Sequence, residues 1–251
     1  DSLVARRSDH PGEDGSPVAR RRWTIDALRV ALDANGLTGA ICSDPNERAD
    51  CDDAQPAAAL QRFLAARKFD VRATLLMIEA HVAWRAATLP VELTLDIEAG
   101  LRRGKFFAPP FRDLGGRPLL HVRNSHFDPH GRDLATAVRA TVFAVEAAIA
   151  SLPSGVSQCS VLYDRSDFSF RRNWDFEFLK AVIGCLQANY PERLGRVYVF
   201  PTGGVASMLW RLISPFMDPR TRAKVVLVSS DLTQHLPAEA VPRRSGGPAH
   251  F

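Results

Sequence analysis

The sequence predicts an α/β protein: a mostly parallel β-sheet covered by helices and preceded by a small α-helical module. From Arg117 onward, short segments rich in Val, Leu and Tyr alternate with longer amphipathic segments. A strand–helix–strand pattern repeated three times is typical of a largely parallel sheet with helices packed on it. Before Arg117 the apolar residues recur at helical spacing instead. With 251 residues, 46% of them hydrophobic, the chain can bury one sizeable core and a smaller helical appendage.

The amino-terminal part is predicted to contain an arm and a first helix. Residues 1–22 are rich in Arg, Asp, Gly and Pro and are expected to form a flexible arm. Within it, Arg20–Arg22 could contact an anionic membrane or form a solvated tail. A helix is expected to start near Thr24 and to stop at Asn35 and Gly36, a favourable pair for a helix C-terminus.

Two further helices complete the predicted helical module, which spans residues 23–95. The first covers residues 57–68, and the second begins after Asp70, a good N-cap, and ends before Pro90. Their apolar residues at helical spacing are Leu60, Phe63 and Leu64, then Val71, Leu75, Ile78 and Val82.

The sheet is predicted to lie in a lobe that spans residues 96–251. Strands are expected where β-branched and aromatic residues concentrate, and helices in the longer segments between them. The strand candidates are residues 118–123, 159–164, 196–200 and 224–228, and the helix candidates are 133–151, 174–189 and 205–216.

Motifs of common enzymes are missing from the sequence. It contains no G-x-S-x-G nucleophile motif, no G-x-x-x-x-G-K-[ST] phosphate loop and no G-x-G-x-x-G after a strand. No catalytic residue is therefore predicted. Metal-ligand spacing occurs once, at His121, His126, Asp128 and His130, but Asn, Asp, Pro and Gly around them favour an ordinary turn, so no metal site is predicted.

Charge and hydropathy point to a soluble protein. The formal net charge of +4 comes mainly from arginine and suits phosphate-bearing partners, which include nucleic acid and anionic lipid. No run of about eighteen apolar residues and no signal peptide are visible. A cytoplasmic location is therefore expected.

Three segments together resemble a known lipid-binding family. Residues 189–195 read Asn-Tyr-Pro-Glu-Arg-Leu-Gly, and residues 213–224 read Ile-Ser-Pro-Phe-Met-Asp-Pro-Arg-Thr-Arg-Ala-Lys. Upstream, residues 60–70 read Leu-Gln-Arg-Phe-Leu-Ala-Ala-Arg-Lys-Phe-Asp, followed by Trp84 and Arg85. From residue 57 to 247 the chain resembles the CRAL-TRIO family, and most closely its phosphatidylinositol-transfer branch with the amino-terminal helical module. The resemblance implies a carrier of a single lipid and not a catalyst.

The resemblance also implies a site for an inositol phosphate headgroup. In the phosphatidylinositol-binding branch, a basic pair, the glutamate of the Pro-Glu-Arg motif, and a threonine and a lysine after the Asp-Pro turn surround the headgroup. Taken one at a time, these residue types also suit a helix end or a solvated strand edge. The matching residues are Arg67, Lys68, Glu192, Thr221 and Lys224.

A mobile gate is implied for residues 203–217. Since each lipid methylene exposed to water costs about 0.8 kcal/mol, a carrier needs an apolar cavity and a means of opening it. Periodicity alone would fit an ordinary helix that covers the core. The gate residues implied by the resemblance are Gly203, Gly204, Val205, Met208, Leu209, Leu212, Ile213 and Phe216.

The cavity face of the central strand departs from choline-lipid carriers of the family. Strand alternation puts Cys159, Val161 and Tyr163 on one face. Relatives that carry phosphatidylcholine have hydroxyl side chains at the positions of Cys159 and Val161, so an apolar cavity and a preference for phosphatidylinositol are expected. A few relatives bind haem, and Tyr163, Cys159 or a nearby histidine could ligate its iron.

The sequence thus predicts a phospholipid transfer protein with no cofactor other than the bound lipid. It is expected to act as a monomer, to contact membranes transiently and not to bind nucleic acid. Three alternatives stay open: a lipid-sensing module that regulates a lipid kinase, a carrier of another hydrophobic ligand such as a sterol or haem, and an α/β enzyme with an unrecognised site.

Overall fold

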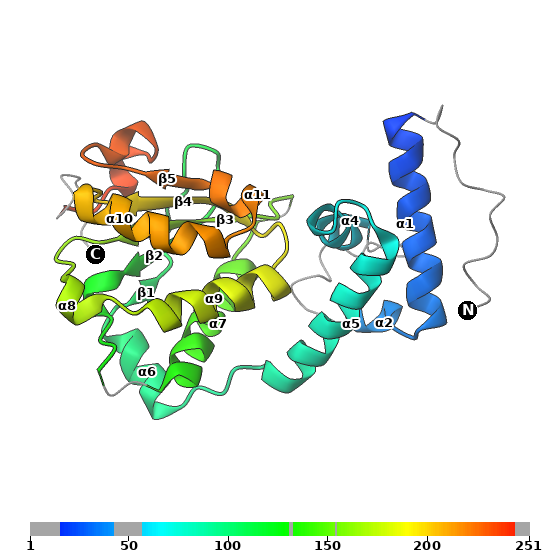
Figure 1. Cartoon of the computed structure of the whole chain (residues 1–251), viewed down its shortest axis with the longest axis horizontal. Helices are drawn as coiled ribbons and strands as arrows, with labels where there is room; N and C mark the ends of the chain where they lie inside the picture. Colours follow the sequence, from blue (N-terminus) through cyan, green and yellow to red (C-terminus); the bar gives the residue numbers. More distant parts are fainter. Residues whose placement is uncertain (1–15, 43–56, 131–132, 154, 244–251) are drawn as a thin grey trace. The chain divides into compact units, whose positions relative to one another are not determined.

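A computed structural model describes residues 16–42, 57–130, 133–153 and 155–243. The chain divides into two compact units, residues 1–87 and residues 88–251. Helices make up the first unit, and a five-stranded sheet with helices makes up the second (Figure 1). The predicted fold class is therefore confirmed. The boundary between the units lies earlier than the one predicted at residue 95.

The first unit has a helical core. Its helices are α1 (Pro17–Ala34), α2 (Thr38–Cys42), α4 (Ala57–Ala66) and α5 (Val71–Thr88). They bury a cluster of apolar side chains that includes the predicted Leu60, Phe63, Leu64 and Ile78. Asp70 caps α5 as predicted, since its carboxylate accepts a hydrogen bond from the Ala73 N–H at 2.8 Å.

Helix α1 begins earlier than the sequence suggested. Ser16 caps it by accepting a hydrogen bond from the Ala19 N–H at 3.2 Å, and Pro17 occupies the first turn, where its missing N–H costs nothing. The second part of the predicted arm is therefore helical, including Arg20–Arg22. Residues 1–15 of that arm lie outside the described residues.

The sheet of the second unit has strands in chain order, β1-β2-β3-β4-β5. Strand β1 pairs antiparallel with β2, and the other neighbours are parallel. The strands are β1 (Phe106–Phe107), β2 (Leu119–Arg123), β3 (Cys159–Asp164), β4 (Leu194–Phe200) and β5 (Val225–Leu227).

The helices of this unit connect the strands. Parallel neighbours taken in chain order need crossovers of one hand, which put the connecting helices α7, α9 and α10 on the same face of the sheet. Figure 1 shows these three helices together. The helices are α6 (Leu95–Arg102), α7 (Leu134–Ala150), α8 (Phe170–Asn173), α9 (Phe176–Asn189), α10 (Gly204–Ile213) and α11 (Pro219–Ala223), with 3-10 turns η1 (Asn124–His126), η2 (Ser214–Phe216), η3 (Leu232–Gln234) and η4 (Ala238–Ala240).

The two faces of the sheet are buried to different degrees. One face packs against the carboxyl-terminal segment that contains η3 and η4. This core consists of Leu119, Leu162, Tyr198, Phe200, Val228, Leu232, Leu236, Ala240 and Val241, all of them buried. The opposite face packs on α7 and forms a smaller buried cluster of Leu120, Ala148 and Cys159.

Candidate functional site

The helix-covered face of the sheet keeps accessible apolar surface. On β3, Cys159 is buried, whereas Val161 and Tyr163 are only partly buried. Their neighbours Val197 and Val199 on β4 lie directly opposite them and are also partly buried. Since β3 has a strand on each side, this exposure indicates that the helix layer does not cover the face completely. We call this surface the floor. The side chains that the predicted cavity strand β3 contributes to it, Cys159, Val161 and Tyr163, carry no charge.

Two side chains of this floor can ionise but are neutral near pH 7. The ordinary pKa values of a thiol and a phenol lie above neutral pH, and burial raises those of Cys159 and Tyr163 further. The Cys159 sulfur also lies 3.8 Å from the carbonyl oxygen of Arg193. The floor therefore offers neutral surface to a ligand.

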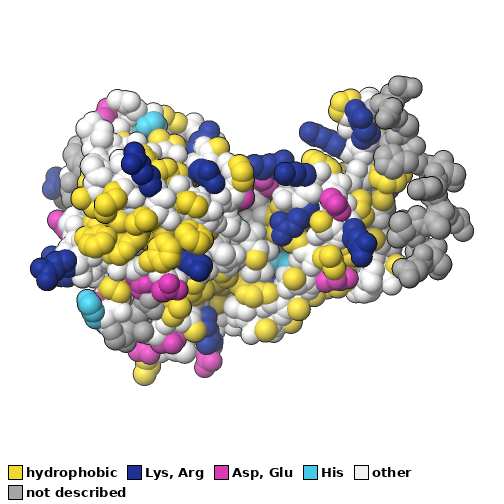
Figure 2. Space-filling model, in the orientation of Figure 1, with side chains coloured by type: hydrophobic (Ala, Val, Ile, Leu, Met, Phe, Trp, Pro, Cys, Tyr) yellow, Lys and Arg dark blue, Asp and Glu magenta, His cyan; other side chains and the backbone are white. Residues whose placement is uncertain are grey.

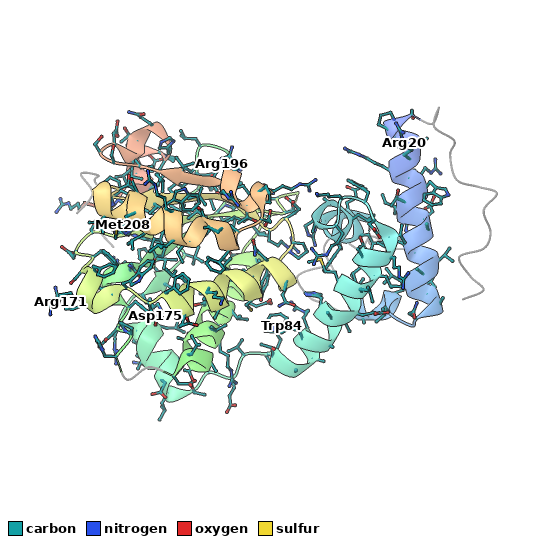
Figure 3. All side chains as sticks on the ribbon, in the orientation of Figure 1. Arg20, Trp84, Arg171, Asp175, Arg196 and Met208 are labelled. Carbon is teal, nitrogen blue, oxygen red and sulfur yellow. The ribbon has the colours of Figure 1, made fainter. Side chains whose placement is uncertain are left out.

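Helix α10 is apolar on two sides. Leu209 and Ile213 face inward and are buried. On the outer side, Met208 and Leu212 are about half exposed, at 51% and 50%. Figure 2 shows apolar side chains gathered over α10, and Met208 is labelled in Figure 3. A helix that only covers a core has polar residues on its outer side. The outer apolar stripe, which we call the α10 stripe, is Val205, Met208, Leu212 and Phe216.

The two ends of α10 differ. Gly203 and Gly204 begin the helix, and a Cβ atom added to either would meet no heavy atom within 4 Å. At the other end, the Phe216 ring packs edge-on against Phe176 of α9, with 5.4 Å between the ring centroids. The amino end therefore has flexible backbone in open space, and the carboxyl end is packed.

Charged residues gather around Glu192, next to the amino end of β4. Its carboxylate pairs with Lys224 Nζ at 2.9 Å and with Arg220 Nη1 at 3.4 Å. Glu192 itself has a left-handed backbone, with φ of 56°. Such a conformation is unfavourable for a side-chain-bearing residue and is enriched at functional sites.

Asp218 brings Thr221 into the same cluster. Its carboxylate accepts hydrogen bonds from the Thr221 hydroxyl and from the N–H groups of Arg220 and Thr221, both at 2.9 Å. Burial alone would raise the pKa of Asp218, but these hydrogen bonds and the charge of Lys224 lower it. The structure thus brings the predicted Glu192, Thr221 and Lys224 together, and sequence reasoning missed Arg220.

The family model of the CRAL/TRIO domain matches residues 101–247. The chain belongs to the CRAL/TRIO domain family. This confirms the resemblance inferred from the sequence. The CRAL/TRIO domain thus coincides with most of the second unit, and the floor, α10 and the Glu192 cluster all lie within it.

Several curated proteins are similar to most of this chain. The chain is 27% identical to the phosphatidylinositol transfer protein CSR1 of Eremothecium gossypii over 212 residues, which are 78% of this chain and 48% of the relative. It is 31% identical to a CRAL-TRIO domain-containing protein of Schizosaccharomyces pombe, over 89% of this chain and 51% of that one. The alpha-tocopherol transfer protein-like protein of Mus musculus is 28% identical over 76% of this chain and 58% of its own length. The chain thus spans about half the length of these relatives.

A solved structure supports the fold. The crystal structure of Sfh5 matches with a TM-score of 0.68, covering 86% of this chain and 83% of that one, at 17% sequence identity. At this identity the match concerns the fold alone. The structural match covers more of the chain than the family model does.

The predicted basic pair lies outside the CRAL/TRIO match. Arg67 and Lys68 follow α4 in the first unit, and both are exposed. Lys68 has a left-handed backbone, with φ of 53°, in the tight turn that leads to α5. Their side chains are therefore available to solvent in that unit.

A buried polar network at the other face of the CRAL/TRIO sheet was not predicted. The Asp113 carboxylate accepts hydrogen bonds from Ser160 Oγ at 2.6 Å and from Arg117 Nε at 2.8 Å. Burial alone would raise the pKa of Asp113, but these hydrogen bonds and the charge of Arg117 lower it. Tyr198 Oη lies 3.4 Å from the same carboxylate. The turn Asp-Leu-Gly-Gly-Arg at residues 113–117 is visible in the sequence. Ser160 and Tyr198, which contact Asp113, are far from it in the chain.

The histidines with metal-ligand spacing have other contacts. His121 is buried, with Nε2 3.2 Å from the Asp164 carboxylate, and His126 Nδ1 lies 2.6 Å from the carbonyl oxygen of Arg103. The Asp128 carboxylate accepts a hydrogen bond from the His130 backbone N–H. Among the described residues, no group of three or more His, Cys, Asp or Glu side chains is arranged to hold a metal ion.

Across residues 16–42, 57–130, 133–153 and 155–243, none of the helices combines the length and hydropathy that crossing a bilayer requires.

Proposed function

We propose that the protein carries one phosphatidylinositol molecule between membranes, with the acyl chains on the apolar floor of the sheet beneath α10. The observation that carries this proposal is that α10 is apolar on both its inner and outer sides. Buried Leu209 and Ile213 suit contact with the floor and the acyl chains, and exposed Met208 and Leu212 suit contact with a bilayer. Phosphatidylinositol transfer is also the activity in the name of the Eremothecium gossypii relative.

The headgroup phosphate is proposed to bind at the Glu192 cluster. A phosphodiester removed from water needs charged donors. Lys224 now pairs with Glu192, and Arg220 is a second partner for that carboxylate. Lys224 would turn from Glu192 to the phosphate, while Glu192 and Thr221 accept and donate hydrogen bonds at the inositol hydroxyls. The sequence resemblance also implies Arg67 and Lys68 as headgroup ligands, and this stays a prediction.

Exchange is proposed to begin when the α10 stripe enters the membrane surface. Burying Met208 and Leu212 in lipid is favourable by about 25 cal/mol for each Å² of apolar surface removed from water. Gly203 and Gly204 provide the backbone freedom for α10 to move away from the floor. The bound lipid then leaves along an apolar path, another enters, and α10 closes again before the protein leaves the membrane.

Choline lipids are proposed to be poorer ligands. Cys159 and Val161 lack a hydroxyl group on the helix-covered face. The neighbouring Ser160 hydroxyl points to the opposite face and donates to Asp113. Positions 159 and 161 therefore do not provide the hydrogen bonds that choline-lipid carriers have there.

The test is a vesicle-to-vesicle transfer assay with labelled lipids. We expect faster transfer of phosphatidylinositol than of phosphatidylcholine, and native mass spectrometry should detect one phosphatidylinositol per chain. Cys159→Ser combined with Val161→Thr should raise phosphatidylcholine transfer, with the single variant Val122→Thr on neighbouring β2 as the control. Equal or faster phosphatidylcholine transfer by the unmodified protein would contradict the proposed ligand.

Other functions give other results in the same assay. A sensor that regulates a lipid kinase would bind lipid but transfer it slowly, and an enzyme would change the lipid chemically. A carrier of another ligand would transfer a sterol or tocopherol instead; a tocopherol transfer protein-like relative gives this alternative some support. A haem carrier would show the absorption spectrum of bound haem when haem is added to the protein. We propose a monomeric carrier without catalytic activity that works in the cytoplasm, contacts membranes transiently and does not bind nucleic acid.

A further inference from the structure

One side chain of α9 holds the segment that follows α10. Gln187 lies in the last turn of α9, and its amide contacts the backbone on both sides of Met217. Nε2 donates to the carbonyl oxygen of Phe216 at 3.1 Å, and Oε1 accepts from the Asp218 N–H at 2.7 Å. Met217 between them is extended, with φ −98° and ψ 138°. The Gln187 amide therefore pairs with this segment as the backbone of a neighbouring strand would.

The same side of α9 also packs against the Phe216 ring. Phe176 and Lys180 are four residues apart, and Gln187 follows seven residues later, a spacing that puts all three on one helix face. The Phe176 ring meets the Phe216 ring edge-on, and Lys180 Nζ lies 5.5 Å from its centroid. The carboxyl end of α10 is thus attached to α9 by hydrogen bonds and by ring contacts.

The amino end of α10 has contacts of a different kind. The Ser207 hydroxyl donates a long bond of 3.5 Å to the carbonyl oxygen of Gly203, within the same turn. Gly203 and Gly204 have open space where a side chain would lie. Glycine backbone has the conformational freedom that the proposed opening of α10 requires at this end.

The Gln187 amide also connects α10 with the charged cluster. Asp218, whose N–H donates to Gln187, is the residue that caps α11 and accepts hydrogen bonds from Thr221. Lys224 follows at the end of α11. If Gln187 released this segment, Asp218 and the Thr221 that it binds would lose a contact with α9, whereas Lys224 is also held by Glu192.

We propose that Gln187 is a positioning residue that fixes the segment after α10 as a pivot and keeps Asp218 and Thr221 in place while the helix opens. This inference rests on the proposed role of α10 as a gate. It differs from the gate proposal because it assigns the fixed end, the residue that fixes it and the link to the headgroup cluster.

The first test is hydrogen–deuterium exchange of the full chain without added lipid. Gln187→Met keeps side-chain length and helix propensity but removes both hydrogen bonds. Amide exchange in residues 204–218 should become faster by roughly tenfold, as expected for the loss of two neutral hydrogen bonds. Exchange in α7 and in the first unit should stay unchanged. The matched control is Gln61→Met, since Gln61 is exposed on α4 of the first unit.

The second test measures release of bound phosphatidylinositol to acceptor vesicles. Gln187→Met should release lipid faster and retain it less well, whereas Gln61→Met should behave like the unmodified protein. Gln187→Glu keeps an acceptor for the Asp218 N–H but loses the donor, so its exchange and release rates should lie between the two.

The outcomes separate the inference from the proposed function. Unchanged exchange in residues 204–218 of folded Gln187→Met would overturn the pivot. Failure of both Gln187 variants to fold, or faster exchange throughout the second unit, would also overturn it and make Gln187 a general structural residue. An unmodified protein that carries no lipid would contradict the proposed function, while the exchange experiment would still decide how α10 is held.

Discussion

The glycine at position 195 is required by a side chain from a distant turn. Arg117 is held by Asp113 through an ion pair of 2.8 Å, and its side chain crosses Gly195 of β4. A Cβ atom at residue 195 would lie 2.4 Å from Cδ and 2.7 Å from Nε of Arg117. Because the ion pair fixes this arginine, the clash cannot be relieved without loss of the contact with Asp113.

We therefore expect Gly195→Ala to lower the free energy of unfolding by about 1–3 kcal/mol, the range typical of overpacking. Urea denaturation should show a lower midpoint with an unchanged slope. The control is Gly184→Ala on α9, where a Cβ would meet no heavy atom within 4 Å. This change should stabilise the protein by about 0.5–1 kcal/mol, because alanine is the better helix former. A Gly195→Ala protein as stable as the unmodified one would contradict the steric explanation.

Sequence reasoning found some of the important residues and missed others for a consistent reason. Glu192 and Lys224 were recognised because they lie within motifs, and the structure pairs them. Asp113 and Gln187 lie in no motif that was recognised. Their decisive contacts are with Ser160 and Asp218, 47 and 31 residues away in the chain. Such pairs depend on how the strands and helices pack, which local patterns do not encode.

At the scale of elements, α10 has an inner side whose side chains pack in the protein and an outer side whose side chains are exposed. Leu209 was predicted with the other gate residues, and it is 7% exposed, so a charge there would disturb packing. Met208 and Leu212 are better probes of the outer side, since both are about half exposed.

We expect Met208→Glu combined with Leu212→Glu to reduce vesicle-to-vesicle lipid transfer by at least about tenfold, because two carboxylates oppose entry of α10 into a bilayer. Thermal stability should change little, as both side chains are exposed. Leu76→Glu is the control, because Leu76 is 58% exposed on α5 in the other unit. Undiminished transfer by the double variant would remove the α10 stripe from the mechanism.

Secondary structure was predicted well for strands and helices long enough to show a periodic pattern of apolar residues, and it was missed for the shortest strand. Strand β3 has the predicted bounds, and α7 and α9 differ from their predicted ranges by one or two residues at an end. Strand β1 has two residues, too few to show an alternation, and exists because it pairs with β2. Helix α1 starts early because Ser16 caps it. The charged residues that follow Ser16 led to the prediction of a flexible arm there.

At the scale of the molecule, the residues that the resemblance implies for the headgroup lie in two compact units. Glu192, Thr221 and Lys224 belong to the second unit, whereas Arg67 and Lys68 belong to the first. The family model covers only part of the second unit and does not include the basic pair. A double-mutant cycle measures whether Lys68 and Lys224 are energetically coupled in phosphatidylinositol binding.

We expect Lys68→Ala and Lys224→Ala each to weaken phosphatidylinositol binding and, together, to weaken it at least about tenfold at moderate salt, since each lysine would donate a charge-assisted hydrogen bond to phosphate. Folding should be unaffected by Lys68→Ala, because Lys68 is exposed, and little affected by Lys224→Ala, because Glu192 keeps Arg220 as a partner. If both lysines contact one phosphate, the two losses should not add, and the deviation measures their coupling. Binding of an uncharged ligand such as tocopherol serves as the control and should stay nearly constant in all three variants. Additive losses would indicate that the two units contact the lipid independently, and unchanged phosphatidylinositol binding in the double variant would favour a carrier of an uncharged hydrophobic ligand.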